Sequence, residues 1–183
     1  MKRRYVIADV FTDTPFVGNP VAVVLDAEGM STGQMQQIAA EFGYSETTFV
    51  LPPEDRANTA HVRIFTPTRE IPLAGHPNVG TAFVLASYAT AKGETLPETL
   101  LFEEAAGLVP VRLLKNNGTI SGAELRVPEL LSCRSEVSAG QVAACLSLEA
   151  ECISTAVHQP LVASVGLPFL IVELASRDAL RRC

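Results

Sequence analysis

The sequence predicts an α+β protein in which a sheet curves around one central helix. The first observation is a stretch of fifteen residues, 77–91, that contains no charged side chain. A helix that is apolar on every side is expected to be buried on every side, and fifteen residues are too few to span a bilayer. The second observation is that short strand-like segments precede and follow this stretch. Since the chain has 183 residues, of which 48% are hydrophobic and 19% charged, it can enclose such a helix in a core.

The first elements follow in order from the N-terminus. Residues 5–11 form an expected strand, and the valine-rich residues 20–25 form a second strand that we expect to be buried. A helix is expected after Ser31, because Gln34 completes a capping-box pattern three residues later, and Gly43 ends that helix. Further strands are expected in the first 127 residues, at 45–51, 60–66, 100–104, 108–114 and 124–127.

The pattern starts again after residue 127, which predicts two domains, 1–127 and 128–183. Residues 128–135 have the composition of a boundary between them. The final helix is expected to begin after Ser176, and Cys183 ends it after about two turns. The second domain is therefore expected to be incomplete. Its other elements are a helix at 137–146 and strands at 161–165 and 169–174, joined through Gly166, Leu167 and Pro168.

Charge and composition argue against several classes of function. The net charge is −6 and the basic residues are scattered, so we expect no nucleic-acid partner. No apolar run approaches membrane-spanning length, and the basic residues 2–4 lead into a segment with Asp9, unlike a signal peptide. A cytoplasmic protein is expected. The four cysteines and three histidines form no zinc pattern, and no nucleotide-binding motif occurs, so we expect neither metal nor cofactor.

The segment Gly75-His76-Pro77-Asn78 opens the apolar helix, and Pro77 is expected at its first position. Backbone N–H groups at a helix start have no partner inside the helix and carry the positive end of its dipole. Such a start is suited to hold an anion. The sequence therefore predicts that a small carboxylate-bearing substrate is bound at residues 75–78.

Four short motifs occur in order along the chain. They are Asp9-Val10-Phe11-Thr12, Phe16-x-Gly18-Asn19-Pro20, Ser45-Glu46-Thr47-Thr48-Phe49 and Ala74-Gly75-His76-Pro77. In this order and spacing they resemble the phenazine-biosynthesis isomerase family, PhzF-like, which is related in fold to diaminopimelate epimerase. The resemblance runs from about Tyr5 to the C-terminus.

The resemblance implies two similar halves, each a curved, mostly antiparallel sheet around a helix, with the active site in the cleft between them. It implies that Glu46 moves a proton between carbon atoms and that His76 is the substrate-site histidine. It also implies a homodimer for intact members. The family's second acidic motif, similar to Glu-Asp-Pro-Ala-Thr-Gly-Ser, is absent from this sequence, which resembles the first half and the opening of the second.

Glu46 and His76 are the candidate catalytic residues, and each has a plainer alternative. Residues 42–51 carry no charged side chain except Glu46, and burial among them would make its carboxylate a stronger base. The plainer alternative is a strand glutamate that simply faces solvent. His76 could orient the substrate, donate a hydrogen bond to its carboxylate or act as a second acid. It could instead be a helix residue bonded to a nearby carbonyl. The resemblance favours the functional role for Glu46, and the position at the helix start favours it for His76.

Four other residues complete the sequence-based picture of the site. Asn19 could point its amide into the cleft or only fix the turn before Pro20. Ser45 could hydrogen-bond near Glu46 or be an ordinary strand serine. Gly75 would let the substrate approach the backbone closely, and is equally suited to a turn. Asp9 is expected to be buried and hydrogen-bonded, because aspartate is unfavourable in a strand.

Three hypotheses for function follow. The leading one is a cofactor-independent isomerase in which Glu46 takes a proton from a carbon activated by a neighbouring carboxylate, enamine or carbonyl. The second is a non-catalytic truncated homologue that binds a small carboxylate or a partner chain. The third is that a separate chain supplies the missing half. Strand edges left open in an incomplete domain also predict self-association, by edge pairing or by exchange of the second-half segment.

Overall fold

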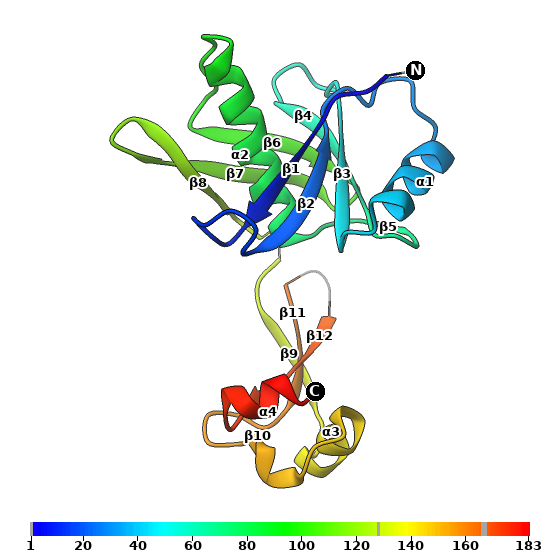
Figure 1. Ribbon diagram of the computed structural model, residues 1–183, viewed down its shortest axis with the longest axis vertical. Helices are drawn as coiled ribbons and strands as arrows, with labels where there is room; N and C mark the ends of the chain where they lie inside the picture. The colour runs from blue at the N-terminus through cyan, green and yellow to red at the C-terminus, as the bar shows by residue number, and fades with distance from the viewer. Residues whose placement is uncertain (1, 128, 166–167) are drawn as a thin grey trace. The chain divides into compact units, whose positions relative to one another are not determined.

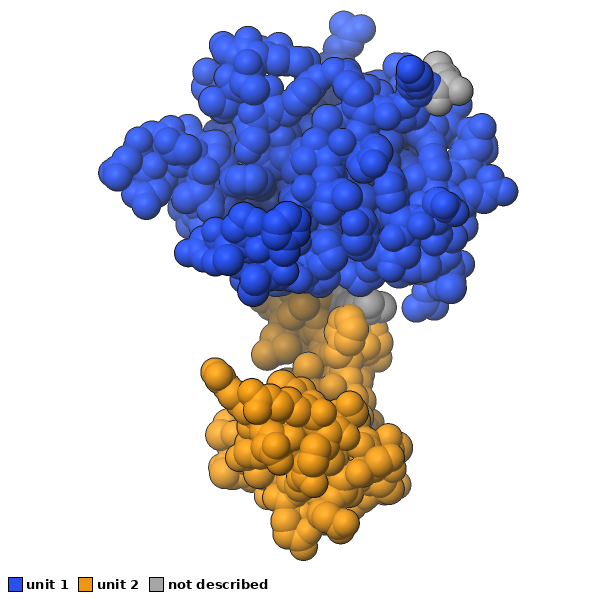
Figure 2. Space-filling view, in the orientation of Figure 1, with its two compact units in different colours: residues 1–128 blue, residues 129–183 orange. Residues whose placement is uncertain are grey.

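The computed structural model describes residues 2–127, 129–165 and 168–183. The chain forms two compact units, residues 1–128 and residues 129–183, coloured separately in Figure 2. Two sequence-based assignments, the connection through Gly166 and Leu167 and the domain boundary at Pro128, lie outside the described residues. Within the described ranges, no helix combines the length and apolarity needed to cross a membrane.

The first unit is one eight-stranded sheet that curls around helix α2 (Gly75–Ala91), with helix α1 (Thr32–Phe42) on its other face (Figure 1). The strand order is β1-β2-β3-β4-β6-β7-β8, and β5 pairs with β4. Pairing is antiparallel except between β2 and β3 and between β4 and β6. The predicted α+β class with a curved, mostly antiparallel sheet around an apolar helix is confirmed. The strands are β1 (Tyr5–Val10), β2 (Asn19–Val24), β3 (Glu46–Leu51), β4 (Ala60–Phe65), β5 (Glu70–Ile71), β6 (Thr99–Glu104), β7 (Gly107–Asn116) and β8 (Thr119–Leu125).

Helix α1 begins and ends where its local sequence predicts. The Ser31 hydroxyl accepts the Gln34 backbone N–H, and the Gln34 side chain accepts the Ser31 N–H. Gly43 adopts the left-handed conformation that ends the helix. Because these contacts satisfy backbone groups that the helix itself leaves unpaired, three residues define both ends of α1.

The two faces of the sheet carry two separate cores. Strand side chains alternate between faces, so on β3 Val50 belongs to the core around α2 whereas Phe49 belongs to the core under α1. Phe49 meets Phe65 of β4 edge to face, with ring centroids 5.3 Å apart. By the same alternation, Glu46 and Thr48 lie on the face of β3 that Val50 turns toward α2. The Thr48 and Thr81 hydroxyls confirm this contact at 2.8 Å.

Helix α2 packs against β1, β2, β3, β7 and β8. The helix packs tightly at Gly80, where an added Cβ would lie 2.5 Å from a Val21 methyl carbon and 2.9 Å from a Val10 methyl carbon. The expectation that α2 is buried on every side is wrong, because Phe83 is 37% exposed and Ser87 is also exposed. Phe83 lines a groove of about 690 Å³ whose other lining residues come mainly from β1, the loop after it, and β8. The two edge strands β1 and β8 do not pair with each other, which leaves this side of the helix uncovered.

The start of α2 differs from the prediction by two residues. The helix begins at Gly75 after the N-cap Ala74, so Pro77 is its third residue and not its first. The shift costs no hydrogen bond, because the N–H groups of the first turn have no partner within the helix and proline lacks only such a group.

The second unit is smaller and contains two short sheets. Its core consists of Val142, Ala143 and Ile153, with partly buried neighbours such as Val172 and Leu174. The three-stranded sheet has the order β12-β11-β9, and β10 pairs with β13. The elements are β9 (Ser132–Glu136), α3 (Ala139–Leu146), the 3-10 turn η1 (Ala150–Cys152), β10 (Ile153–Ser154), β11 (Leu161–Ser164), β12 (Pro168–Ile171), β13 (Glu173–Leu174) and α4 (Arg177–Arg181).

Two predictions in the second unit need correction. Strand β9 overlaps the segment 128–135 that was expected to be only a boundary. All five of its residues are exposed, so the segment has the polar composition of a loop. The single strand expected at 169–174 is divided into β12 and β13, which belong to different sheets. The expected cap of α4 is confirmed, because the Ser176 hydroxyl accepts the Ala179 N–H.

Candidate active site

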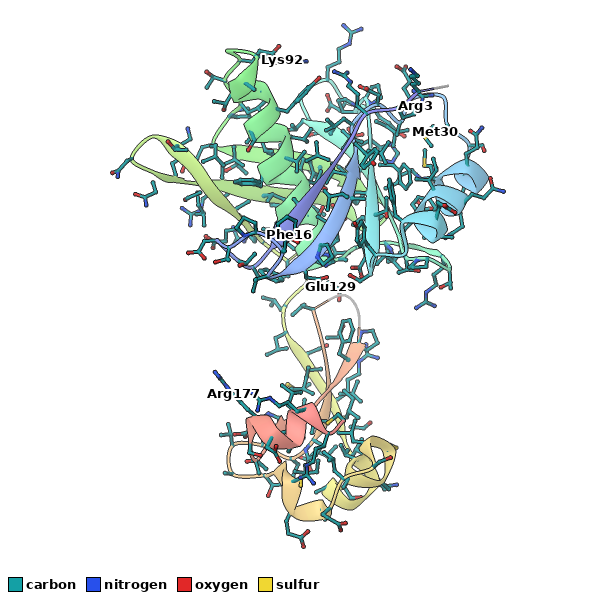
Figure 3. The ribbon with its side chains drawn as sticks, in the orientation of Figure 1. Arg3, Phe16, Met30, Lys92, Glu129 and Arg177 are labelled. Atoms are coloured by element: carbon teal, nitrogen blue, oxygen red, sulfur yellow. The ribbon has the colours of Figure 1, made fainter. Side chains whose placement is uncertain are left out.

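Three segments of the first unit begin at the same end of the sheet. Strands β2 and β3 are parallel, with Val21 paired to Glu46, so both start together. Helix α2 starts beside them, since His76 contacts Glu46. Figure 3 shows this polarity: Phe16, in the loop before β2, lies at the end where α2 begins, and Lys92 lies at the far end of α2. The parallel pairing of β2 with β3 and the position of α2 therefore bring side chains that are far apart in the sequence close together.

Glu46 and His76 are in direct contact at this end of the sheet. The Glu46 Oε2 lies 3.2 Å from the His76 Nδ1, within reach of a hydrogen bond. The two side chains are 19% and 8% exposed, respectively. The alternative that Glu46 is an ordinary solvent-facing strand residue does not fit this geometry. A carboxylate that is largely shielded from water and touches an imidazole is suited to proton transfer.

Burial determines the protonation of His76. Loss of hydration lowers the pKa of His76 below its ordinary value of 6.5, while the Glu46 carboxylate and the Pro20 carbonyl raise it in part. The imidazole is therefore neutral at pH 7. A neutral ring has one N–H donor and one acceptor nitrogen, so donation from Nδ1 to Glu46 would leave Nε2 as the acceptor.

Asn19 and Ser45 meet at the starts of β2 and β3. The Ser45 hydroxyl donates to the Asn19 Oδ1 at 3.0 Å, and both residues are exposed. The bond fixes the amide of Asn19 to Ser45, the residue that precedes Glu46. The turn before Asn19 is held separately, because the Asp9 carboxylate accepts the Phe16 N–H at 2.8 Å. Asp9 is thus hydrogen-bonded as predicted, although it is half-buried instead of fully buried.

The first turn of α2 has no side-chain cap. Its N-cap is Ala74, which makes no side-chain hydrogen bond to the first turn, and no acidic residue lies in that turn. Gly75 is exposed, whereas His76 and Pro77 are buried. The unpaired N–H groups and the positive dipole end therefore remain uncompensated by the helix's own cap.

Asn78 lies apart from the other predicted site residues. Its side chain is fully buried, and it lies close enough to Glu104 of β6 to affect the pKa of that carboxyl. The sequence analysis did not single out Glu104. The available signal was the strand pattern itself, because Leu100, Phe102 and Glu104 alternate onto one face and place a carboxyl where the other two residues are apolar.

Known proteins share both this sequence and this fold. An uncharacterized isomerase of Mesorhizobium japonicum is 39% identical over 183 residues, which cover 98% of this chain and 59% of that protein. The trans-2,3-dihydro-3-hydroxyanthranilate isomerase of Pseudomonas chlororaphis is 43% identical over 125 residues, covering 68% of this chain and 42% of that enzyme. The chain thus spans roughly half the length of such relatives.

Solved structures extend the likeness to the fold. A phenazine biosynthesis protein of the PhzF family from Bacillus anthracis has a TM-score of 0.82 and 29% identity, over 100% of this chain and 59% of that one. A predicted epimerase from Pseudomonas aeruginosa has a TM-score of 0.83 and 31% identity, over 99% and 62%. Residues 8–183 also match the family described as Phenazine biosynthesis-like protein. The expected resemblance is confirmed, and the chain belongs to the phenazine biosynthesis-like (PhzC-PhzF) family.

Proposed function

We propose that this chain carries the Glu46 side of an isomerase site that moves a proton between carbon atoms of a small carboxylate substrate. The observation that carries the proposal is the contact of 3.2 Å between Glu46 and His76 at the start of α2. A base for a carbon acid must be held against the C–H bond and shielded from water. Glu46 suits this role, since β3 fixes its backbone and only 19% of its side chain is exposed.

The chemistry balances without an oxidant or reductant. The Glu46 carboxylate takes a proton from the substrate carbon, and the electron pair of the broken C–H bond moves into an adjacent unsaturated or carbonyl group. The proton returns to another carbon, from Glu46 or from a second acid, and a double bond shifts between the two positions. Neutral His76 would orient the Glu46 carboxylate through Nδ1.

The substrate carboxylate is assigned to the first turn of α2. The N–H groups of Gly75 and His76 would donate to it, and Pro77 shapes the turn without competing as a donor. Asn19, held by Ser45, would supply an amide to a polar group on the same substrate. Asn78 supports the turn from the buried side.

Relatives suggest the first substrate to test. Enzymes about 40% identical over 68% of this chain are named trans-2,3-dihydro-3-hydroxyanthranilate isomerases. We propose a related substrate, a cyclic carboxylate with an activated C–H bond. Self-association, predicted from the sequence, is a further proposal, and β1 offers it an edge strand in which Tyr5, Val6 and Ile7 are exposed.

The decisive experiment follows deuterium from solvent into trans-2,3-dihydro-3-hydroxyanthranilate by NMR. The 183-residue chain is compared with Glu46→Gln and with Glu41→Gln, an exposed glutamate of α1, as the matched control. We expect exchange in the wild type and the control and at least a roughly hundredfold loss in Glu46→Gln, with binding within a few-fold. Full exchange in Glu46→Gln would refute the assignment of the base.

A second function is favoured by one observation on the sequence. The family's second acidic motif is absent from these residues, so binding of a carboxylate without turnover is the alternative. Binding of the substrate by the wild type with no exchange of any C–H would establish that alternative. Exchange that appears only after addition of a chain carrying the motif would instead assign the second acid to a separate polypeptide.

A further inference from the structure

Glu104 is a buried acid that the proposed reaction does not use. It is the last residue of β6 and lies on the same face as Leu100 and Phe102, both of which are fully buried. Only 9% of Glu104 is exposed, and neither carboxyl oxygen is accessible to solvent or has a well-aligned hydrogen-bond partner among the described residues. Buried polar groups without partners are rare, because each costs about 1–3 kcal/mol of lost hydration. The presence of a carboxyl in this position calls for a role.

Asn78 lies close to Glu104 and is equally isolated. It is fully buried, and within the described part of the chain neither its amide nitrogen nor its amide oxygen makes a well-aligned hydrogen bond. Asn78 nevertheless lies close enough to lower the pKa of Glu104 in part. Each side chain is therefore a candidate hydrogen-bond partner for the other. The apolar core around them offers few other donors or acceptors.

The pair lies at the start of α2, close in sequence to the candidate active site. Asn78 follows His76 by two residues, about 200° around the helix, and His76 contacts Glu46. Glu46 and Glu104 therefore approach the start of α2 from different sides. They are also apart along the sheet, because the register of β3, β4 and β6 sets Glu104 level with the end of β3 and not with Glu46 at its start.

We propose that Glu104 is a positioning residue, which sets the first turn of α2 through Asn78 and so places the backbone that would hold the substrate carboxylate. This inference rests on the proposed function for the meaning of that turn. The neutral carboxyl offers both an O–H donor and a carbonyl acceptor, which match the acceptor and donors of the Asn78 amide. An ionised carboxylate loses its donor and must recruit water or other donors, which would displace the turn.

The surroundings keep Glu104 in the neutral form. Burial raises the pKa of Glu104 to about 8, and the nearby Asn78 lowers it only in part. The residue paired with Glu104 in β7 is Gly107, which has no charge. The remaining ionisable groups on the packed elements are engaged elsewhere or exposed: His76 with Glu46, Arg63 with Glu70, Arg112 with Glu124, His61 beside Glu103, and the outlying Tyr88 and Lys115.

The test follows the backbone amides of Gly75, His76 and Asn78 by NMR between pH 7 and pH 10. In the wild type they should titrate with an apparent pKa of about 8. In Glu104→Gln, which keeps a donor and an acceptor but cannot ionise, this titration should vanish. Phe102→Leu is the control, because it alters the neighbouring inward-facing side chain and should keep the wild-type titration. An unchanged titration in Glu104→Gln, or none in the wild type, would overturn the inference.

A second measurement separates this inference from the proposed function. Anthranilate, a stable fluorescent carboxylate, is titrated into the same three proteins at pH 7 and pH 9.5. We expect about threefold to tenfold weaker binding at the higher pH in the wild type and Phe102→Leu, the size of one lost hydrogen bond, and no such loss in Glu104→Gln. A pH-dependent loss that persists in Glu104→Gln would count against Glu104. If anthranilate binds none of the proteins at either pH, the carboxylate site is rejected, while the amide titration still decides whether Glu104 positions the turn.

Discussion

The Oε2 of Glu46 lies 3.2 Å from the Nδ1 of His76, although the two residues are separated by a strand pair and a long loop in the sequence. Glu46 begins a strand and His76 lies in the first turn of a helix. Their contact joins a largely shielded carboxylate to a neutral imidazole at the positive end of a helix dipole. Four predictions follow from this site and its supporting core, each with its own measurement.

Removing the Glu46 charge should lower the pKa of His76 further. The carboxylate now raises that pKa against the larger effect of burial, so Glu46→Gln leaves burial less opposed. The ring nitrogens of His76, observed by ¹⁵N NMR across pH 4–8, report the titration directly. Glu41→Gln should leave it unchanged. A higher His76 pKa in Glu46→Gln would show that the two groups do not interact as the structure indicates.

Glu104 should make stability fall as pH rises. The unfolded chain releases the Glu104 proton near pH 4.5, whereas the folded chain keeps it to about pH 8. Between these values the folded state binds more protons, so the favourable difference is complete below pH 4.5 and is lost as pH approaches 8. Glu104→Gln should therefore gain roughly 1–3 kcal/mol relative to wild type between pH 4.5 and pH 8. Urea unfolding at both pH values measures this, and a constant difference would contradict it.

Gly80→Ala should destabilise the first unit. The new methyl group would lie 2.5 Å from a Val21 carbon, so α2 must move away from the sheet, at a cost of about 1–3 kcal/mol. Gly33→Ala is the matched control, because the Cβ there meets nothing closer than 4.0 Å in helix α1. That change should be neutral or stabilising by up to about 1 kcal/mol. Thermal unfolding compares the two variants, and equal effects would show that α2 is not closely packed at Gly80.

The buried hydroxyl pair of Thr48 and Thr81 should show strong coupling. Thr48→Val keeps the side-chain shape but leaves the Thr81 hydroxyl without this partner, at a cost of about 1–3 kcal/mol. The double variant Thr48→Val, Thr81→Val removes both polar groups and should recover part of that loss. A double-mutant cycle in urea measures the coupling. Strictly additive effects would show that the bond between β3 and α2 contributes nothing.

Much of the fold was predictable because its signals are local. Ser31, Gln34 and Gly43 define α1 through hydrogen bonds and backbone preferences within a few residues of each helix end. The uncharged stretch in α2 and the alternation in β4 likewise predict buried elements. The motifs around Glu46 and His76 identified the candidate residues and the family before any distance was known.

Only the tertiary structure decided which of these residues meet. The parallel pairing of β2 with β3 brings Ser45 to Asn19, and the approach of α2 brings His76 to Glu46, while Asn78 is turned toward Glu104. Phe83 is exposed because the edge strands β1 and β8 do not pair with each other. No local sequence pattern indicates this. Capping and periodicity involve neighbours along the chain, so sequence determines them. Contacts between distant segments depend on register, crossover and packing of the whole sheet, and these are determined only when the chain folds.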